Sequence, residues 1–190
     1  MSRLKPLAPE SLPELKESFQ HFRDLLGYVP NNAAVLSRRP KMVKGLAGLA
    51  SAVWDPANEV DRGLKRLVAY MASKAHGSRY SMAHSAEAAH RSGVPHAKVE
   101  AVDDYRTSPL FTEAERVALE FAAAGAAQPC AVTDEMFARL KKHWTEAQIV
   151  EIAAVVAING FLNRWAEMFQ LDLEAEPAAF AKKHLPRHFR

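Results

Sequence analysis

The sequence predicts an all-α protein of about eight to nine helices, and two kinds of observation support this prediction. Apolar residues recur at offsets of three and four, as at Leu64, Leu67 and Met71, which is the period of a helix with one buried face. Helix-start signals stand before several of these apolar runs. The alternating pattern and tight turns of β-hairpins are absent from the sequence. We therefore expect a bundle of amphipathic helices.

The expected helices follow one another with short connections. We place them at about 10–26, 31–37, 40–54, 59–75, 78–92, 95–103, 112–125, 133–142 and 145–169. A capping box, in which a Ser or Thr precedes a Glu or Gln by three residues, occurs at Ser11, Thr112 and Thr145. Gly93 and Pro95 are typical of the end of one helix and the start of the next. These signals support five of the expected boundaries.

Length and composition favour a single domain. The chain has 190 residues, 48% of them hydrophobic and 25% charged, so it can bury a sizeable core without a disulfide or a structural metal. We expect the domain to span 1–171. Within it, N-terminal packing helices (1–55) would cover two helical halves that share a helix–turn–helix pattern, 59–103 and 112–171. Residues 172–190 are expected to form a looser C-terminal tail.

Charge and apolar runs limit the classes of partner. The net charge of +3 is small and the basic residues are scattered, so we expect no nucleic-acid partner. The N-terminus lacks the apolar core of a signal peptide, and no stretch approaches the roughly 18 apolar residues of a membrane span. We therefore expect no membrane partner and a cytoplasmic location.

Cysteine and histidine usage limits the chemistry. The single cysteine, Cys130, cannot form a disulfide within the chain, and we expect it to be structural. The sequence contains no HExxH motif and no Cys/His cluster with zinc spacing. We expect neither a metal nor another cofactor.

The candidate site lies in "AHGSRYSMAH", residues 75–84. Gly77 ends one helix and Ser78 is a natural N-cap for the next, with Ser81 and His84 following at intervals of three. One interpretation is a Ser–His nucleophile pair. The other is a capped helix start with a surface serine and a core histidine. A serine nucleophile also needs an orienting acid and an oxyanion hole, and no GxSxG elbow occurs here, so the spacing favours the capped helix.

This stretch and its surroundings resemble the AhpD-like and carboxymuconolactone decarboxylase superfamily, in its peroxidase-related branch. The resemblance runs from about Phe22 to Leu173. Its pieces are "VLSRRPKMVKGL", "GLKRLVAYMASKAHGSRYSMAHSAEAAHRSGV", "FTEAERVALEFA" and "VTDEMFARLKKHWTEAQIVEIAAVVAINGFLNRW". It implies an AhpD-like helical bundle that assembles as a dimer, trimer or hexamer through its core helices. Apolar stripes on nearly every helix agree with a homo-oligomer.

The resemblance also shows where this chain departs from the redox members. Their core motif is C-x-Y-C-x-x-H, with a glutamate twelve residues before the first cysteine. The resemblance implies that the two cysteines cycle between dithiol and disulfide while the glutamate and histidine relay protons. Here the two cysteine positions hold Ser78 and Ser81, and the glutamate position holds Arg66. Tyr80 and His84 keep the pattern.

These replacements bear directly on the expected chemistry. A hydroxyl cannot be oxidised to a disulfide, and its pKa lies far above that of a thiol. An arginine at position 66 also removes a proton acceptor and reverses the charge. In some members the relay histidine lies one position later, where this chain has Ser85. The resemblance therefore predicts a thiol motif that has lost its thiols.

Three functions remain open from the sequence. The first is a redox-dead relative that binds a small molecule. The second is a non-thiol enzyme, of decarboxylase or lactone type, with His84 as general acid/base and Arg66 or Arg79 holding a small anionic ligand. The third is residual alkylhydroperoxidase activity through Cys130, for which the chain has no resolving cysteine. The candidate site residues are His84, Ser78, Ser81, Tyr80, Arg66 and Arg79.

Overall fold

The computed structural model describes residues 1–189, and over that range it contains helices and no strands, which confirms the all-α prediction. Ten α-helices are present, eight of them at least seven residues long. Their bounds are α1 Lys16–Leu26, α2 Asn31–Leu36, α3 Pro40–Val53, α4 Arg62–His76, α5 Arg79–Arg91, α6 His96–Glu100, α7 Glu113–Ala126, α8 Asp134–Leu140, α9 Glu146–Phe169 and α10 Ala175–His184.

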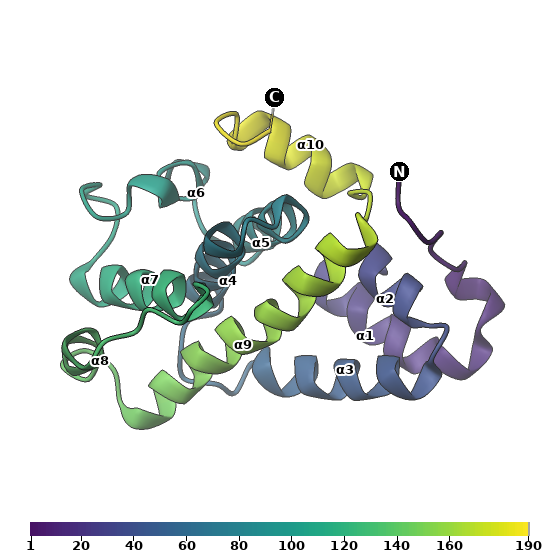
Figure 1. Cartoon of the computed structure of the whole chain (residues 1–190), viewed down its shortest axis with the longest axis horizontal. Helices are drawn as coiled ribbons and strands as arrows, with labels where there is room; N and C mark the ends of the chain where they lie inside the picture. Colours follow the sequence, from purple (N-terminus) through teal and green to yellow (C-terminus); the bar gives the residue numbers. More distant parts are fainter. Residues whose placement is uncertain (190) are drawn as a thin grey trace.

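The helices surround a central pair, α4 and α5. Figure 1 shows this pair in the middle of the molecule, with α7 and α8 on one side and the N-terminal helices α1, α2 and α3 on the other. The long helix α9 runs diagonally between these groups and contacts α3, α4, α5 and α7. Helix α10 lies across α5 and α6. Side chains from all these groups can therefore meet beside α5.

The sequence between α4 and α5 explains their tight reversal. Asp61 caps the start of α4, because its side chain accepts a hydrogen bond of 2.8 Å from the backbone N–H of Leu64. Gly77 ends α4 with φ +84°, a left-handed conformation that suits glycine. Ser78 then follows as the N-cap position of α5. The C-terminal end of α4 thus lies beside the first turn of α5, where the candidate motif begins.

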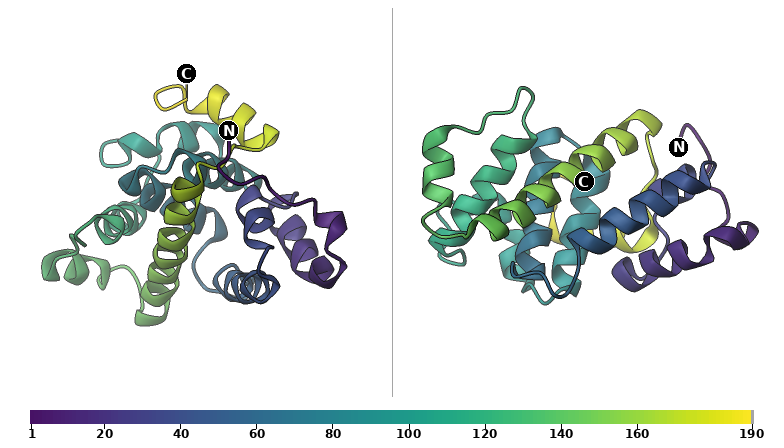
Figure 2. Two further views of the ribbon diagram at one scale, coloured as in Figure 1. Left: turned by 45° about the vertical axis from the view of Figure 1, so that its right-hand side comes forward. Right: turned by 90° about the horizontal axis from the view of Figure 1, so that it is seen from below.

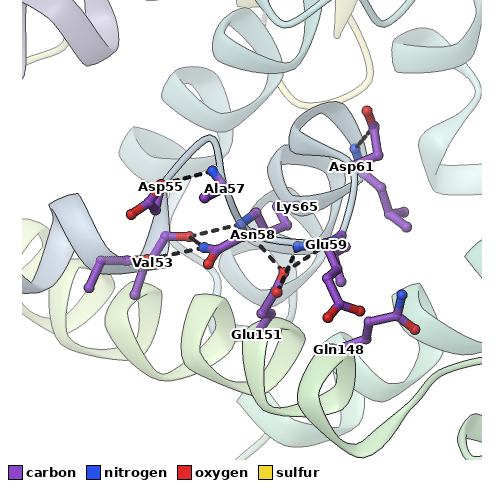
Figure 3. A network of polar contacts seen from close by, with 12 residues as sticks. Val53, Asp55, Ala57, Asn58, Glu59, Asp61, Lys65, Gln148 and Glu151 are labelled. Carbon is purple, nitrogen blue, oxygen red and sulfur yellow. Dashed lines mark hydrogen bonds and ion pairs between the residues drawn. The ribbon is translucent and has the colours of Figure 1, made fainter.

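A buried lysine ties α4 to its surroundings (Figure 3). The Nζ of Lys65 donates a 2.9 Å hydrogen bond to the carbonyl of Val53 and lies 3.7 Å from a carboxylate oxygen of Glu151 on α9. The same carboxylate accepts hydrogen bonds from the backbone N–H groups of Glu59 and Val60, at 2.8 and 2.9 Å. Burial lowers the pKa of Lys65, although Glu151 opposes the shift. The connection between α3 and α4 is thereby held against α9.

Two sequence expectations are corrected by the fold. The expected loose tail at 172–190 instead contains α10, which is held because Ala181, Leu185 and Phe189 are buried in the main core. The expected capping box at Ser11 is absent, and its hydroxyl donates to the carbonyl of Ala8 at 2.7 Å. Prolines begin two short 3-10 turns there, at 9–11 and 13–15, and helix α1 starts only after them.

The other two capping boxes are confirmed. The side chain of Thr112 accepts from the backbone of Glu115, whose carboxylate accepts from the backbone of Thr112, so both free N–H groups are satisfied. Thr145 and Gln148 repeat this arrangement at the start of α9. The starts of α7 and α9 therefore lie where their sequences place them.

Helix α9 is long and apolar enough to cross a membrane on the criteria of length and composition. A core helix of a soluble protein meets the same criteria, so the observation is weak evidence for a membrane span. Here α9 packs against five other helices, α2, α3, α4, α5 and α7. The absence of a membrane partner and the cytoplasmic location stay predictions.

Candidate functional site

A cavity of about 80 Å³ lies beside α5, between α1, α3, α4 and α9. Most of its wall is apolar and comes from α1, the end of α3 and α9. The main apolar residues are Phe22, Leu25, Leu46, Trp54, Ile158 and Leu162. The polar side chains are contributed by α2, α4, α5 and α9, and they are Asn32, Arg66, Tyr80, Ser81, His84, Ser85 and Asn159. Such a mixture is typical of a small-molecule site.

His84 is held at both ring nitrogens. Its Nδ1 lies 2.9 Å from the hydroxyl of Tyr28, in the connection after α1. Its Nε2 lies 2.7 Å from a carboxylate oxygen of Glu174, the residue just before α10. Three segments that are far apart in the sequence therefore converge on one imidazole.

Glu174 connects this imidazole to a second ring. Its other carboxylate oxygen accepts a 2.9 Å hydrogen bond from the hydroxyl of Tyr80 and another from the backbone N–H of Asn31. Burial alone would raise the pKa of Glu174, but the hydrogen bonds and charge of His84, with the backbone of Asn31, hold this pKa below its ordinary value. Glu174 is therefore ionised at neutral pH.

The state of the carboxylate fixes the direction of the hydrogen bonds. An ionised carboxylate can only accept, so the proton of the His84–Glu174 contact lies on Nε2. Burial, together with the charge of Glu174, raises the pKa of both Tyr28 and Tyr80, so both phenols keep their protons. On the other side of the ring, the hydroxyl of Tyr28 lies 2.9 Å from Nδ1, within hydrogen-bond distance. The result is a hydrogen-bonded chain, Tyr80–Glu174–His84–Tyr28.

The two serines occupy the first turn of α5 without pairing with His84. The hydroxyl of Ser78 donates to the hydroxyl of Ser81 at 3.4 Å, and it makes no capping hydrogen bond to the helix backbone. Both serines are buried, so Ser81 is not the surface residue of the capped-helix interpretation, and it lines the cavity. His84 directs both nitrogens to other partners, so the Ser–His nucleophile arrangement is not formed.

The two candidate arginines lie in different places. Arg66 reaches the cavity from α4, is 6% exposed, and stacks on Trp54 with its guanidinium carbon 3.6 Å from the ring centroid. Burial lowers the pKa of Arg66 to about 9. Arg79 is exposed and lies 4.9 Å from the ring of Phe189, in a separate surface hollow. Only Arg66 is positioned to meet a ligand in the cavity.

Cys130 is exposed and lies in a third hollow, beside α7, α8 and α9. It is thus separate from the motif serines. Within residues 1–189, no group of three or more His, Cys, Asp or Glu side chains is arranged to hold a metal ion. The expectations of no metal and no cofactor stay predictions.

Sequence reasoning missed Tyr28 and Glu174. The first lies in a turn after α1 and the second in the segment expected to be a loose tail, and neither has a spacing that links it to His84. Arg66 stands at the position where the resemblance places a glutamate. The structure supplies a carboxylate to His84 from Glu174 instead.

Comparison with known proteins defines the class. Among solved structures, a peroxidase-related protein from Ralstonia eutropha JMP134 with an alkylhydroperoxidase AhpD core is 20% identical and covers 93% of this chain and 94% of its own, with a TM-score of 0.80. A peroxidase-related protein from a Silicibacter species is 21% identical and covers 92% and 90%, with a TM-score of 0.74. At these identities the likeness shows the fold, which is the AhpD-like helical fold.

A further solved structure is similar in sequence as well as in fold. The debrominase Bmp8, crystallised as a cysteine-to-alanine variant with 2,3,4-tribromopyrrole, is 33% identical and has a TM-score of 0.90. The alignment covers 94% of this chain and 95% of Bmp8. The chain therefore belongs to the same family as the debrominase Bmp8, and it has the AhpD-like helical fold.

Two other comparisons add less. No family model matches the chain. The uncharacterized protein YnjA of Escherichia coli K12 is 37% identical over 68 residues, which span 36% of this chain and 37% of that curated relative. This match is too short to carry an activity or a partner to this chain.

Proposed function

We propose that this protein binds a small organic molecule in the cavity beside His84 and that it does so without thiol redox chemistry. The observation that carries the proposal is the cavity itself. Apolar walls enclose a space onto which Arg66, Tyr80, Ser81 and His84 converge. Such a combination of an apolar wall and a few polar groups is what a ligand site requires.

The serines support the absence of thiol chemistry. Ser78 and Ser81 stand where the resemblance assigns the two redox cysteines, and neither hydroxyl can form a disulfide. Cys130 lies in a different hollow and has no second cysteine in the chain to resolve an oxidised sulfur. The protein is thus proposed to be a redox-dead relative that retains the pocket.

The comparison with Bmp8 suggests a first ligand. That protein holds 2,3,4-tribromopyrrole in a variant in which one cysteine is replaced by alanine. In this chain, the rings of Phe22 and Trp54 line the cavity and would pack against a flat heteroaromatic molecule. We therefore propose a small planar ring compound as the ligand, with 2,3,4-tribromopyrrole as the compound to test first.

Filling the cavity tests the proposal. Ala50 lines the cavity from α3, whereas Ala52 on the same helix is exposed, so Ala50→Leu and Ala52→Leu add the same volume at different places. Calorimetric titration with 2,3,4-tribromopyrrole should give saturable binding to the wild type and to Ala52→Leu, and binding weaker by about tenfold or more to Ala50→Leu. No binding, or equal binding to both variants, would contradict the proposal.

A second assay tests the absence of thiol chemistry. The wild type should show no dithiol-dependent reduction of an organic hydroperoxide. The double variant Ser78→Cys/Ser81→Cys places two thiols at the start of α5, where the two oxygens now lie 3.4 Å apart. That variant should form a disulfide and gain measurable turnover, while Ser78→Cys alone should not. Robust turnover by the wild type would refute this part of the proposal.

The hydrogen-bonded chain favours one alternative function. A non-thiol enzyme could move a proton along Tyr80–Glu174–His84, because Tyr80 and His84 both line the cavity and Glu174 bridges them. In this alternative His84 is the general acid/base that faces the substrate, and Glu174 orients its ring from Nε2. If His84→Ala leaves the decarboxylation or lactone conversion of every active substrate unchanged, the alternative is wrong.

A further inference from the structure

We propose that Arg66 is an anion-binding residue, so that the ligand of the cavity is a small planar carboxylate or a similar flat anion. This inference rests on the proposed function, because it concerns the same cavity. It specifies two further properties of the ligand, which are its negative charge and the carboxylate-like group that Arg66 would bind. It is carried by the geometry of Arg66 and by the polar atoms that this side chain leaves without partners.

The guanidinium of Arg66 is buried but is not satisfied by the protein. Two of its nitrogens, Nε and Nη2, are buried and have no hydrogen-bond partner among the described residues. The side chain nevertheless lines the cavity. Buried polar atoms in folded proteins almost always have partners, so two free donors beside a cavity indicate a missing acceptor.

The two free nitrogens have a specific arrangement. Nε and Nη2 point from the same edge of the planar guanidinium, and this edge matches the two oxygens of a carboxylate in a bidentate pair. One face of the guanidinium is covered by the ring of Trp54, which restrains its orientation. Trp54 therefore holds the guanidinium in one orientation, with this edge free of protein acceptors.

The charges around Arg66 are consistent with this assignment. Within residues 1–189, no carboxylate lies within 4.0 Å of its guanidinium. Glu87 on α5 influences Arg66 through space, but its ion pair is with Arg91, at 3.4 Å. Arg62 adds a second positive charge that disfavours the Arg66 cation. A bound anion would compensate a buried positive charge that the protein leaves unpaired.

Matched pairs of compounds test the inference in the intact protein. Acetate and benzoate carry the carboxylate, while acetamide and benzamide have nearly the same shape and no charge. The fluorescence of Trp54 and calorimetry should both report binding. We expect the wild type to bind at least one carboxylate about tenfold or more tightly than its amide, as charged hydrogen bonds imply.

Variants of the two arginines provide the control. Arg66→Met should lose the preference for the carboxylate, whereas Arg79→Met, at an exposed position outside the cavity, should keep it. The ligand-free Arg66→Met protein should also have a higher Tm than the wild type, because an unpaired buried charge has been removed. A purely structural role of Arg66 on Trp54 predicts a lower Tm instead.

The outcomes separate this inference from the proposed function. Equal affinity of the wild type for carboxylate and amide, or a carboxylate preference that survives Arg66→Met, overturns the anion assignment alone. Loss of all binding to 2,3,4-tribromopyrrole and to these four compounds overturns both. If Arg66→Met does not fold, the comparison of carboxylate with amide in the wild type still decides.

Discussion

Lys65 and Arg66 are consecutive residues of the buried helix α4, and their positive charges have different partners. Lys65 has a carbonyl and a carboxylate within reach, from Val53 and Glu151. Arg66 has an aromatic face and two free donors. The Lys65 network holds segments together, whereas the Arg66 side chain is directed to the cavity. The difference gives these residues distinct roles in stability and binding.

The contacts of Lys65 predict different losses in the free energy of unfolding for two substitutions. Lys65→Met removes the buried charge and leaves Glu151 its two backbone partners, so we expect a loss of about 1–3 kcal/mol in the free energy of unfolding. Glu151→Ala leaves the buried ammonium without its carboxylate and should lose about 3–5 kcal/mol. Urea denaturation measures both values.

The control for these substitutions is an exposed ion pair. Lys141 and Glu146 lie 3.0 Å apart and are 51% and 84% exposed. Glu146→Ala should therefore leave the free energy of unfolding almost unchanged. A larger loss in Lys65→Met than in Glu151→Ala would mean that the carboxylate does not compensate the buried lysine.

At the scale of elements, the packing of α10 positions Glu174, the residue that completes the site. Glu174 precedes its first turn, and further contacts along the C-terminal segment anchor it. Asp103, after α6, accepts from Lys74 and lies 2.5 Å from the ring of His188. A stack of three imidazoles, His90, His96 and His184, joins α5 and α6 to α10.

Two carboxylates make the docking of α10 sensitive to acid. Burial would raise the pKa of Asp103, but hydrogen bonds from Lys74 and His188 lower it, and the pKa of Glu174 is also held below its ordinary value. A lowered carboxyl pKa contributes stability that is present above the ordinary values of 3.8 and 4.5 and is lost as the pH falls through the lower, folded-state values. We expect α10 to lose hydrogen-exchange protection progressively as the pH falls below about 4.5.

The matched variant for this acid transition is Glu174→Gln/Asp103→Asn. It keeps the size of both side chains and removes their titration. The slope of α10 stability against pH in this window should be smaller than in the wild type. An equal slope in the two proteins would show that other groups control the docking of α10.

The imidazole stack predicts an earlier transition in a different pH range. Desolvation within the stack and the charges of His90 and His184 lower the pKa of His96 from its ordinary 6.5, although its side chain lies at the surface. The native protein thus disfavours the protonated ring, and stability is lost as the pH falls from 6.5 toward the lower folded-state value. His96→Phe keeps an aromatic ring and removes the charge. Hydrogen exchange in α10 should depend less on pH in this variant, over a range in which Glu174 stays ionised.

The helices were largely predictable because their signals are local. Apolar periodicity and capping residues identified α4, α5, α7 and α9. Helix α10 was missed because it is stabilised by contacts with α5 and α6 that no local signal reveals. The motif predicted that Tyr80, His84 and Ser81 lie together. No local signal could connect Tyr28 or Glu174 to them, because tertiary packing creates that contact.

At the scale of the whole molecule, two neighbouring helices, α3 and α9, carry exposed apolar side chains. Met42 and Leu49 lie on α3, and Val150, Phe161 and Met168 lie on α9. The view from below in Figure 2 shows these two helices next to each other on the same side of the molecule. Apolar side chains gathered on one face are typical of a surface that contacts another protein. The homo-oligomer stays a prediction, and this face is the place to test it.

Charges placed on this face should separate the protomers. We expect the wild type to have the mass of a dimer, trimer or hexamer in light scattering, and Leu49→Glu/Phe161→Glu to have the 21.0 kDa mass of one chain. Phe137→Glu, at an exposed apolar residue of α8, is the control and should not change the assembly. A wild type that is monomeric at micromolar concentration would contradict the prediction.

The convergence of Tyr28, His84 and Glu174 has a consequence for the order of folding. These contacts join residues 56 and 90 positions apart, whereas the turn between α4 and α5 joins neighbours in the sequence. Closing long loops is entropically unfavourable, so contacts between distant segments form late. During refolding, helical structure should return first and the cavity should assemble last. The ability to hold a ligand is then a property of the fully folded chain, and it is also the property most easily lost when the ends of the chain loosen.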